Sequence, residues 1–531
     1  MTTLQPREPY SQEELAKLYP EGLQLQLVQI LLRHGERSPV SPRFQNAGVQ
    51  PYWPYCYAAR QMVSITREAN ASDWSSLQWR RRIETFGSDD GPIIARGPGG
   101  EVDGVCNLGE LTDKGRETTS QLGTRLRKLY VEQLGFLPTT IENTDFMYLR
   151  ATPMPRALES LQQTFLGLYP SNYRAVSCPP PTIITRAPAD ETLYPNDSSC
   201  RRFAQVTRAF AQRAADKWNN TDEMEYLNKL IGKWMPESSK RVAVDSHPRI
   251  SGIMDTLNST LAHGPETRLP KEFYDLKGRA IIDKIAMDEW FSGYKESEEY
   301  RVLGIGGLMG DVVSRMVGFV RHKGGDGLLE IGGKTGLTGI GRGGETDIKF
   351  ALSGCHDTTL AAVLSSLGAF DGEAWPPYTS HVALELFKKT HPSLTESKNG
   401  SAGSTNTGWF SNFRGKSPQE TAIARRKISE LSETEKSKLE GYYVRLRYND
   451  KVMRVPGCRA SGKHLDGDDS FCTLVSYKAE STLGAKLTLI SHAQEEFKNI
   501  VDKFTPANWK QACLSNLDVS AFPKIKEPAG Y

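Results

Sequence analysis

Residues 23–39, LQLQLVQILLRHGERSP, decide the fold class of this chain. The stretch alternates apolar and polar residues at first and then becomes continuously apolar up to Leu32. Such a run is typical of a strand whose end is buried on both faces, as in a parallel sheet. Polar residues follow at once, beginning with Arg33 and His34. We therefore expect a strand that delivers polar side chains to the carboxyl end of a sheet.

Two further units have the same order of strand and helix. Residues 144–150 have the pattern of a short strand, and Pro155 opens a helix, because proline is tolerated in the first helical turn. Residues 348–354 and 358–367 form the third unit. Each unit places polar residues after a strand, which is where open α/β sheets bind ligands. The expected fold class is α/β.

The overall charge limits the classes of partner. The chain of 531 residues holds 66 Lys and Arg against 63 Asp and Glu, a net charge of +3. A protein whose main partner is a nucleic acid usually has a strongly basic face, so we expect no nucleic acid partner. No apolar run reaches the ~18–20 residues that span a bilayer, so we also expect no transmembrane segment.

The N-terminal residues and the cysteines bear on location and metal content. Residues 1–22 lack the basic and apolar regions of a secretory signal, which favours an intracellular, by default cytoplasmic, location. The eight cysteines are widely spaced and their pairing stays open. Because no CxxC pair occurs, we expect no structural zinc, and we expect no other metal or cofactor.

The end of the first strand could bind and attack phosphate. His34 lies between Arg33 and Arg37, and Gly35 leaves the backbone unobstructed. Guanidinium groups match phosphate oxygens bidentately, and neutral imidazole is a nucleophile. The alternative is a solvated loop whose charges pair with nearby carboxylates. For such a short motif taken alone, this alternative is favoured.

The other two strand ends add candidates of the same kind. His356 and Asp357 could supply a phosphate contact and a proton donor, or a buried histidine and a helix cap. Arg150 and Arg156 follow the middle strand, and either could face the pocket. An arginine at the start of a helix can donate to phosphate, although most helical arginines are simply solvated.

These motifs together resemble the histidine acid phosphatases, branch two of the histidine phosphatase superfamily. The motifs occur in the family's order: Arg33-His34-Gly35-x-Arg37-x-Pro39, Leu111-Thr112-x-x-Gly115, Arg150-Ala-Thr-x-x-x-Arg156, Ser353-Gly-Cys-His356-Asp357-Thr-Thr359 and Val455-Pro-Gly-Cys458. The resemblance implies that His34 is the nucleophile and Asp357 the general acid. It also implies that phosphate is bound by four residues: Arg33, Arg37, Arg156 and His356.

The resemblance further implies a phosphoglycerate-mutase-like mixed sheet flanked by helices, with an inserted, mainly helical cap. We expect one unit over residues 20–531. Its α/β core would comprise residues 20–40, 108–190 and 345–531, and its cap residues 41–107 and 191–344. Residues 391–420, rich in Ser, Thr, Asn and Gly, are expected to be a flexible insertion.

Within the family, the chain looks most similar to the lysophosphatidic acid phosphatases. The similarity covers the 148–160 block, Leu193-Tyr-Pro-Asn196, and Leu367-Gly-x-Phe-Asp371 to Trp375-Pro-Pro377. It makes lysophosphatidic acid a candidate substrate and a mitochondrion an alternative location. The aromatic run 52–57 could line an acyl group, although core packing is the favoured interpretation.

The sequence thus predicts a metal-independent acid phosphatase acting on small phosphomonoesters through a phosphohistidine. A phytase or sugar-phosphate phosphatase is the first alternative. A non-catalytic phospholigand-binding module is the second, and it would be expected to have lost His34 or Asp357, which are both present. The Gly304–Gly310 run is a weak candidate for a dinucleotide loop and is better explained as the start of a helix. The oligomeric state stays open.

Overall fold

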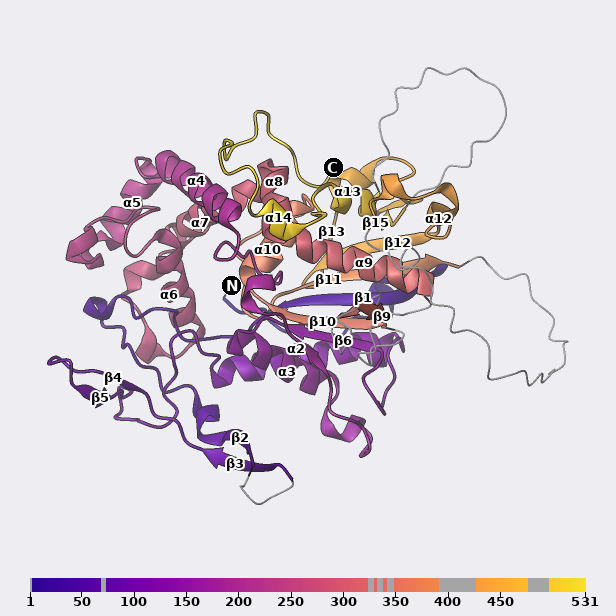
Figure 1. Cartoon of the computed structure of the whole chain (residues 1–531). Coiled ribbons are helices and arrows are strands. Elements are labelled where there is room, and N and C mark those ends of the chain that lie inside the picture. The colour runs from indigo at the N-terminus through magenta and orange to yellow at the C-terminus, as the bar shows by residue number, and fades with distance from the viewer. Residues whose placement is uncertain are drawn as a thin grey trace.

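The computed structural model describes residues 2–67, 73–322, 329–331, 338–340, 348–390, 426–475 and 496–531. Over these residues, a nine-stranded sheet lies at the centre of the molecule with helices on both faces (Figure 1). Its strands, from one edge to the other, are β14 (His464–Leu465), β15 (Asp468–Thr473), β12 (Tyr442–Tyr448), β11 (His381–Lys389), β1 (Leu23–Arg33), β10 (Phe350–Cys355), β6 (Met147–Ala151) and β7 (Ile183–Ile184). The ninth strand, β13 (Lys451–Met453), pairs with β12.

The strand pairing of the sheet changes from parallel to antiparallel at β1. On one side of β1 the pairs β1–β10, β10–β6 and β6–β7 are all parallel. On its other side the pairs β1–β11 and β11–β12 are antiparallel. The expected α/β fold with a mixed sheet is confirmed. The three units predicted from the sequence occupy neighbouring positions in its parallel half.

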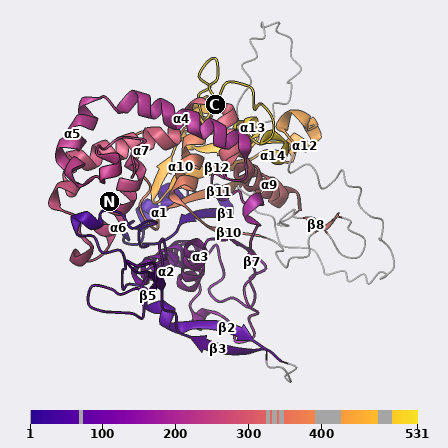
Figure 2. The same cartoon turned by 60° about the vertical axis from the view of Figure 1, so that its left-hand side comes forward.

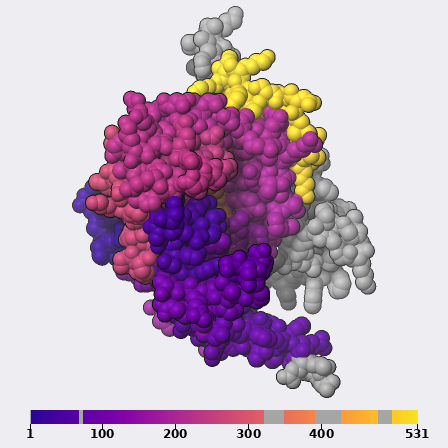
Figure 3. All heavy atoms as spheres, turned by 90° about the vertical axis from the view of Figure 1, so that its left-hand side faces the viewer, coloured from indigo at the N-terminus to yellow at the C-terminus, as the bar shows by residue number. Residues whose placement is uncertain are grey.

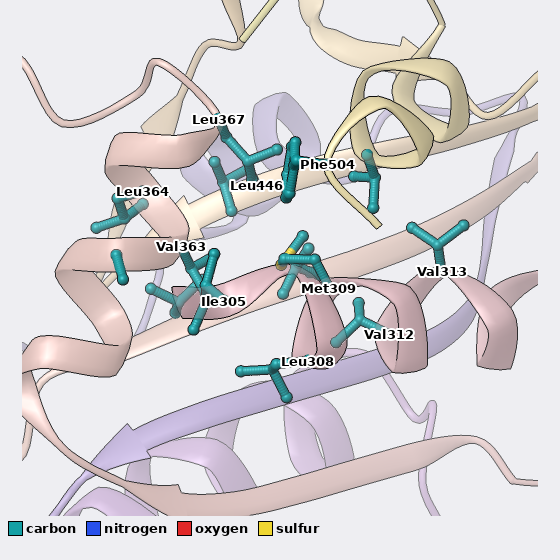
Figure 4. Packing of buried hydrophobic residues seen from close by; sticks show 14 of the residues in the cluster. Ile305, Leu308, Met309, Val312, Val313, Val363, Leu364, Leu367, Leu446 and Phe504 are labelled. Atoms are coloured by element: carbon teal, nitrogen blue, oxygen red, sulfur yellow. The ribbon is translucent and has the colours of Figure 1, made fainter. Parts of the chain in front are cut away.

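The apolar run of β1 serves both faces of the sheet. Val28, Ile30 and Leu32 pack with α2 (Asp113–Arg127) and α3 (Pro155–Leu168). Leu27 and Leu31 belong to the opposite core, together with α9 (Gly307–His322) and α10 (Asp357–Ser366). Figure 4 shows part of this second core, where Met309 of α9 and Ile305 just before it lie near Val363 of α10. This burial on both faces explains why the sequence of β1 stops alternating between apolar and polar residues.

Helix α9 corrects the expected cap boundary. The sequence predicts that residues 191–344 belong to the cap, but Val302–Gly306 and α9 pack on the sheet, and the Gln29 side chain donates to the Val312 carbonyl at 3.0 Å. The stretch Glu298–Val320 is long and apolar enough to cross a membrane, yet 78% of its most apolar 18-residue window is buried inside the protein. Its apolar residues therefore build the core. The Gly304–Gly310 run starts this helix, as the favoured interpretation expected.

The cap consists mainly of four helices that share a core of their own. They are α4 (Arg201–Trp218), α5 (Asp222–Ile231), α6 (Ile250–Ala262) and α7 (Leu276–Glu296). Phe44, Val49 and Trp53 from the segment after β1 complete this core. The cap helices gather beside the sheet on the left of Figures 1 and 2. The expected insertion 391–420 lies outside the described residues.

Among the described residues, shorter elements surround the sheet and the cap. Three two-stranded hairpins pair β2 (Met62–Thr66) with β3 (Ser75–Trp79), β4 (Glu84–Phe86) with β5 (Pro92–Ile94), and β8 (Leu329–Ile331) with β9 (Thr338–Ile340). The β2–β3 hairpin projects from the body of the protein (Figure 3). The remaining α-helices of the described residues are α1 (Gln12–Leu18), α8 (Glu298–Arg301), α12 (Glu433–Ser437), α13 (Phe497–Lys503) and α14 (Trp509–Ala512).

Six of the eight cysteines form disulfides. The pairs are Cys56–Cys106, Cys200–Cys513 and Cys458–Cys472, and the free thiols are Cys178 and Cys355. Structural disulfides persist in oxidising compartments and are rare in the cytosol. They therefore count against the cytoplasmic location expected from the sequence, although the location itself stays a prediction.

Two glycines allow the loop after β1 to lie directly on α2. A Cβ atom on Gly35 would collide with the Gly115 carbonyl oxygen, and one on Gly115 would collide with the Glu36 carbonyl oxygen. The Thr112 backbone N–H donates to that Glu36 oxygen at 3.0 Å, so the two backbones are joined as well as close. The glycines at these positions thus fix the height of the loop above the helix.

We expect Gly115→Ala to lower the free energy of unfolding by about 1–3 kcal/mol, because neither backbone can move away without breaking hydrogen bonds. Activity should fall with it, since the loop carries His34. Gly232→Ala is the matched control, because a Cβ there meets its nearest atom at an ordinary 3.5 Å. Urea unfolding of both variants measures the difference. Equal stability of the two variants would contradict the tight packing at Gly115.

Candidate active site

The candidate site lies where three parallel strands end at the same level. Arg33 of β1 is in register with Cys355 of β10, and Gly354 of β10 is in register with Ala151 of β6. The residues that follow these positions therefore emerge side by side. They include His34, His356 and, at the start of α3, Arg156. The imidazole rings of His34 and His356 lie 5.5 Å apart between centroids.

The loop that carries His34 is held from several directions. The Gly35 N–H donates to Ser160 Oγ of α3 at 3.1 Å. Glu36 is fully buried, and its two carboxylate oxygens accept hydrogen bonds from Thr3 Oγ1 at 2.6 Å and Thr118 Oγ1 at 2.5 Å. An isolated bridge pairs Arg37 with Leu111. The loop is thus fixed by α2, α3 and the N-terminal segment.

His34 is arranged as a neutral base with one free nitrogen. Its ring is buried, and Nδ1 lies 2.8 Å from the Gly35 carbonyl oxygen. Because a carbonyl oxygen only accepts, Nδ1 carries the proton and Nε2 keeps its lone pair. Burial, followed by the charges of Arg156, Arg33 and Arg37, holds the pKa of His34 well below its usual 6.5. The imidazole is therefore uncharged over the ordinary pH range.

His356 is neutral for the same reasons. Burial and Arg156 lower its pKa to about 3, against the opposing effect of Asp357. Its Nε2 lies 3.2 Å from Thr152 Oγ1, which fixes the plane of the ring. A neutral, oriented imidazole can donate one hydrogen bond to an anion without adding charge.

Three arginines surround the histidines. Arg33 pairs with Asp357 at 2.7 Å, Arg37 pairs with Asp255 of α6 at 2.7 Å, and Arg156 contacts Met154 Sδ at 3.3 Å. The Nε atom of each of the three is buried and has no hydrogen-bond partner among the described residues. Burial and the nearby Arg37 lower the pKa of Arg156 to about 10. Such clustered, partly unused guanidinium donors fit a dianionic phosphate.

Asp357 is the first residue of α10, and His356 is its N-cap. Its Oδ2 forms an ion pair with Arg33 at 2.7 Å and accepts a hydrogen bond from the Trp375 indole N–H at 3.0 Å, and its Oδ1 accepts from the Thr358 N–H at 2.8 Å. Burial pushes the pKa of Asp357 up, but Arg33, the Trp375 hydrogen bond and Arg37 outweigh it, so the net shift is downward.

Arg150 and Arg156 lie in different environments. Arg150 is buried in an ion pair with the fully buried Glu191 and also donates to Thr192 Oγ1 at 3.1 Å. Arg156 instead belongs to the cation cluster around His34. The structure therefore brings together all six residues chosen from the sequence and leaves Arg150 in a structural ion pair. Whether the six perform the roles assigned to them stays a prediction.

Sequence reasoning assigned no role to three nearby residues. Asp255 reaches Arg37 from the cap, where no motif marks it. Trp375 belongs to a motif that was recognised, and Tyr378 lies three residues further on. Tyr378 places its ring 4.1 Å beneath the Arg33 guanidinium and 6.0 Å from the His34 ring. The recognised Trp-Pro-Pro motif was the one available signal.

The family model of the histidine phosphatase superfamily (branch 2) matches residues 24–449, most of the chain. The chain belongs to this family. It is a histidine acid phosphatase, a phosphomonoesterase. Within the described ranges, no group of three or more His, Cys, Asp or Glu side chains could hold a metal ion.

The histidine acid phosphatase has similar proteins in other organisms. A probable acid phosphatase of Schizosaccharomyces pombe is 36% identical over 460 residues, which cover 87% of this chain and 92% of that protein. The lysophosphatidic acid phosphatase type 6 of Homo sapiens is 26% identical over 370 residues, covering 69% of this chain and 74% of the human protein. Among solved structures, a phytase of Hafnia alvei matches 86% of this chain and 95% of its own at a TM-score of 0.47 and 13% identity.

The two arginines after β6 give a paired test of this phosphatase. We expect Arg156→Ala to weaken competitive inhibition by inorganic phosphate about ten- to a hundredfold, because it removes a charge-assisted contact. Arg150→Met should instead lower the free energy of unfolding by about 3–5 kcal/mol, because it leaves Glu191 buried without its partner. Inhibition constants and urea unfolding of both variants provide the measurement. Weaker phosphate inhibition in Arg150→Met at unchanged stability would overturn the assignment.

Proposed function

We propose that this acid phosphatase transfers the phosphoryl group of a monoester to Nε2 of His34 and then to water. The observation that carries the proposal is the state of His34: a buried, uncharged imidazole, with Nδ1 fixed on the Gly35 carbonyl and three arginines around it. A neutral imidazole in a cationic pocket is a nucleophile beside the charges that its substrate requires.

The surrounding residues supply the remaining steps. Arg33, Arg37, Arg156 and His356 bind the phosphate oxygens and stabilise the charge that spreads over them during transfer. Asp357, in its protonated form, gives a proton to the departing alcohol. Water then attacks the phosphohistidine, its proton passes to the Asp357 carboxylate, and the bond between phosphorus and Nε2 breaks. Because the arginines neutralise the phosphate, the scheme uses no metal.

We expect His34→Ala to reduce turnover by about a thousandfold or more, because it removes the nitrogen that attacks the phosphorus. Rapid quenching of the wild type with labelled substrate should trap an acid-labile, base-stable phosphoenzyme that the variant lacks. Unfolding midpoints of both proteins control for a loss of fold. A variant that still turns over at the wild-type rate rules out the phosphohistidine.

Asp357→Asn should slow phosphate esters of poor leaving alcohols about 100- to 10,000-fold and p-nitrophenyl phosphate far less. The acid form is needed and the pKa of Asp357 is lowered, so kcat/KM for alkyl phosphates should fall as pH rises above that pKa. A bound phosphate dianion raises the same pKa, so the basic limb of kcat should lie at higher pH than that of kcat/KM. His34 stays neutral down to well below pH 6.5, which places the optimum below pH 7. Equal losses on both substrate types contradict the role of Asp357.

For the substrate, we propose lysophosphatidic acid as the first candidate. Support comes from the human relative's name and from a pocket of about 230 Å³ beside Arg33. The pocket combines apolar side chains such as Met254, Leu257 and Trp375 with polar ones such as Asn258 and Arg279. The aromatic run 52–57 adds no support, because Trp53 is buried in the cap core. Phytate and sugar phosphates remain the alternatives.

Lysophosphatidate and glycerol 3-phosphate differ only in the acyl chain, so their comparison tests an acyl site directly. Burial contributes up to about 0.8 kcal/mol per CH₂, so even a few buried methylenes should raise kcat/KM for the lipid several-fold. The assay should run below the critical micelle concentration. Equal kcat/KM for the two substrates would remove the lipid proposal and leave the phosphatase chemistry intact.

A further inference from the structure

One short segment between α10 and β11 contacts half of the candidate active site. The Trp375 indole N–H donates to Asp357 Oδ2 at 3.0 Å, and the Pro376 carbonyl accepts from Arg33. Tyr378 lies under the Arg33 guanidinium and beside the His34 ring. Residues 375–378 therefore touch the groups proposed as acid, phosphate ligand and nucleophile.

The indole of Trp375 is held from the cap. The backbone N–H of Trp375 lies 3.3 and 3.4 Å from the two carboxylate oxygens of Asp283 on α7. Its ring packs at 5.1 Å from Phe291 and 6.2 Å from Trp290, both on the same helix. Two prolines follow, and their fixed φ angles restrict the backbone beyond the tryptophan. The position of the indole N–H is thus determined by the cap rather than by Asp357.

The two carboxylate oxygens of Asp357 have different surroundings. Oδ2 accepts a hydrogen bond from Trp375 and lies 2.7 Å from the Arg33 guanidinium, whose positive charge opposes a proton on this oxygen. Oδ1 receives a single donor, the Thr358 N–H, and keeps one lone pair. A proton on the carboxyl group therefore has its place on Oδ1.

We propose that Trp375 is a positioning residue which, together with Arg33, assigns the catalytic proton to Oδ1 of Asp357. The inference rests on the proposed function of Asp357 and adds to it which of the two carboxylate oxygens gives the proton to the alcohol. As His34 Nε2 bonds to phosphorus, the ester P–O bond breaks and its electron pair leaves on the alcohol oxygen. That oxygen takes the proton from Oδ1. The negative charge left on the carboxylate is stabilised at Oδ2 by Arg33 and Trp375.

Trp375→Phe removes the indole N–H while keeping an aromatic ring against Phe291. Without it, Oδ2 also becomes open to protonation, and the carboxyl group can rotate away from the alcohol. We expect kcat for alkyl phosphates to fall about tenfold, a part of the full contribution of a general acid. The rate with p-nitrophenyl phosphate should stay within about twofold, since nitrophenolate leaves without a proton.

The pH profile provides a second readout. The Trp375 hydrogen bond lowers the pKa of Asp357, so its loss should move the basic limb for alkyl phosphates to higher pH. The other charged or titratable groups that face Asp357, namely Arg33, Arg37, Arg156 and His356, are unchanged in the variant. A residue with a merely structural role would lower the rate without moving this limb.

Trp290→Phe is the matched control. It removes an indole N–H from the same aromatic cluster, and no contact joins Trp290 to Asp357 among those of the described residues. It should leave both substrate rates and the pH profile unchanged. Equal losses on both substrate types in Trp375→Phe, or unchanged rates on both, would overturn the positioning role.

Measuring Asp357→Asn in parallel separates the two levels of inference. If that variant slows both substrate types equally, Asp357 is not the acid and the proposed function fails with it. If it discriminates between the substrates while Trp375→Phe does not, the acid is correct and the positioning by Trp375 alone is wrong.

Discussion

The register of three parallel strands is the constraint on which this site depends. Because β1, β10 and β6 end at one level, each strand can deliver a different chemical group to the same small volume. The core on both faces of β1 holds that register, since a slip of one residue would turn Leu27 and Leu31 to the face of Val28 and Ile30. The two glycines that seat the His34 loop on α2 then fix its height. Packing away from the candidate site thus sets the distances between the groups within it.

Electrostatics in the site follow from this close arrangement. Three guanidinium groups share a buried space with two imidazoles, and their mutual repulsion is relieved only in part by Asp255 and Asp357. Both imidazoles respond by staying neutral. The cost of gathering the cations is met by folding, so little reorganisation is required when a dianion enters. The cap takes part directly, because Asp255 and Asp283 reach the site from α6 and α7.

The sequence was most informative where local pattern and chemistry coincide. The strand and helix units and the six site residues lie in ordered motifs, and the structure brings those residues together. The assignment of α9 to the cap failed because an apolar helix has the same periodicity whether it packs on a sheet or on other helices. Asp255 carried no signal, since its partner Arg37 is more than two hundred residues away. The cysteine pairs were equally invisible, because spacing alone does not determine connectivity.

The neutral histidines set the pH that favours the general acid against the pH that favours the folded state. The unfolded chain takes up protons at its histidines below about pH 6.5, whereas folded His34 does not, and His356 does so only near pH 3. Each therefore lowers the free energy of unfolding by about 1.4 kcal/mol for every pH unit of acidification across that window. The lowered pKa of Asp357 acts in the same direction at lower pH. Acid thus favours the general acid and opposes the fold, and the cross-links at Cys56, Cys200 and Cys458 offset part of this loss by restricting the unfolded chain.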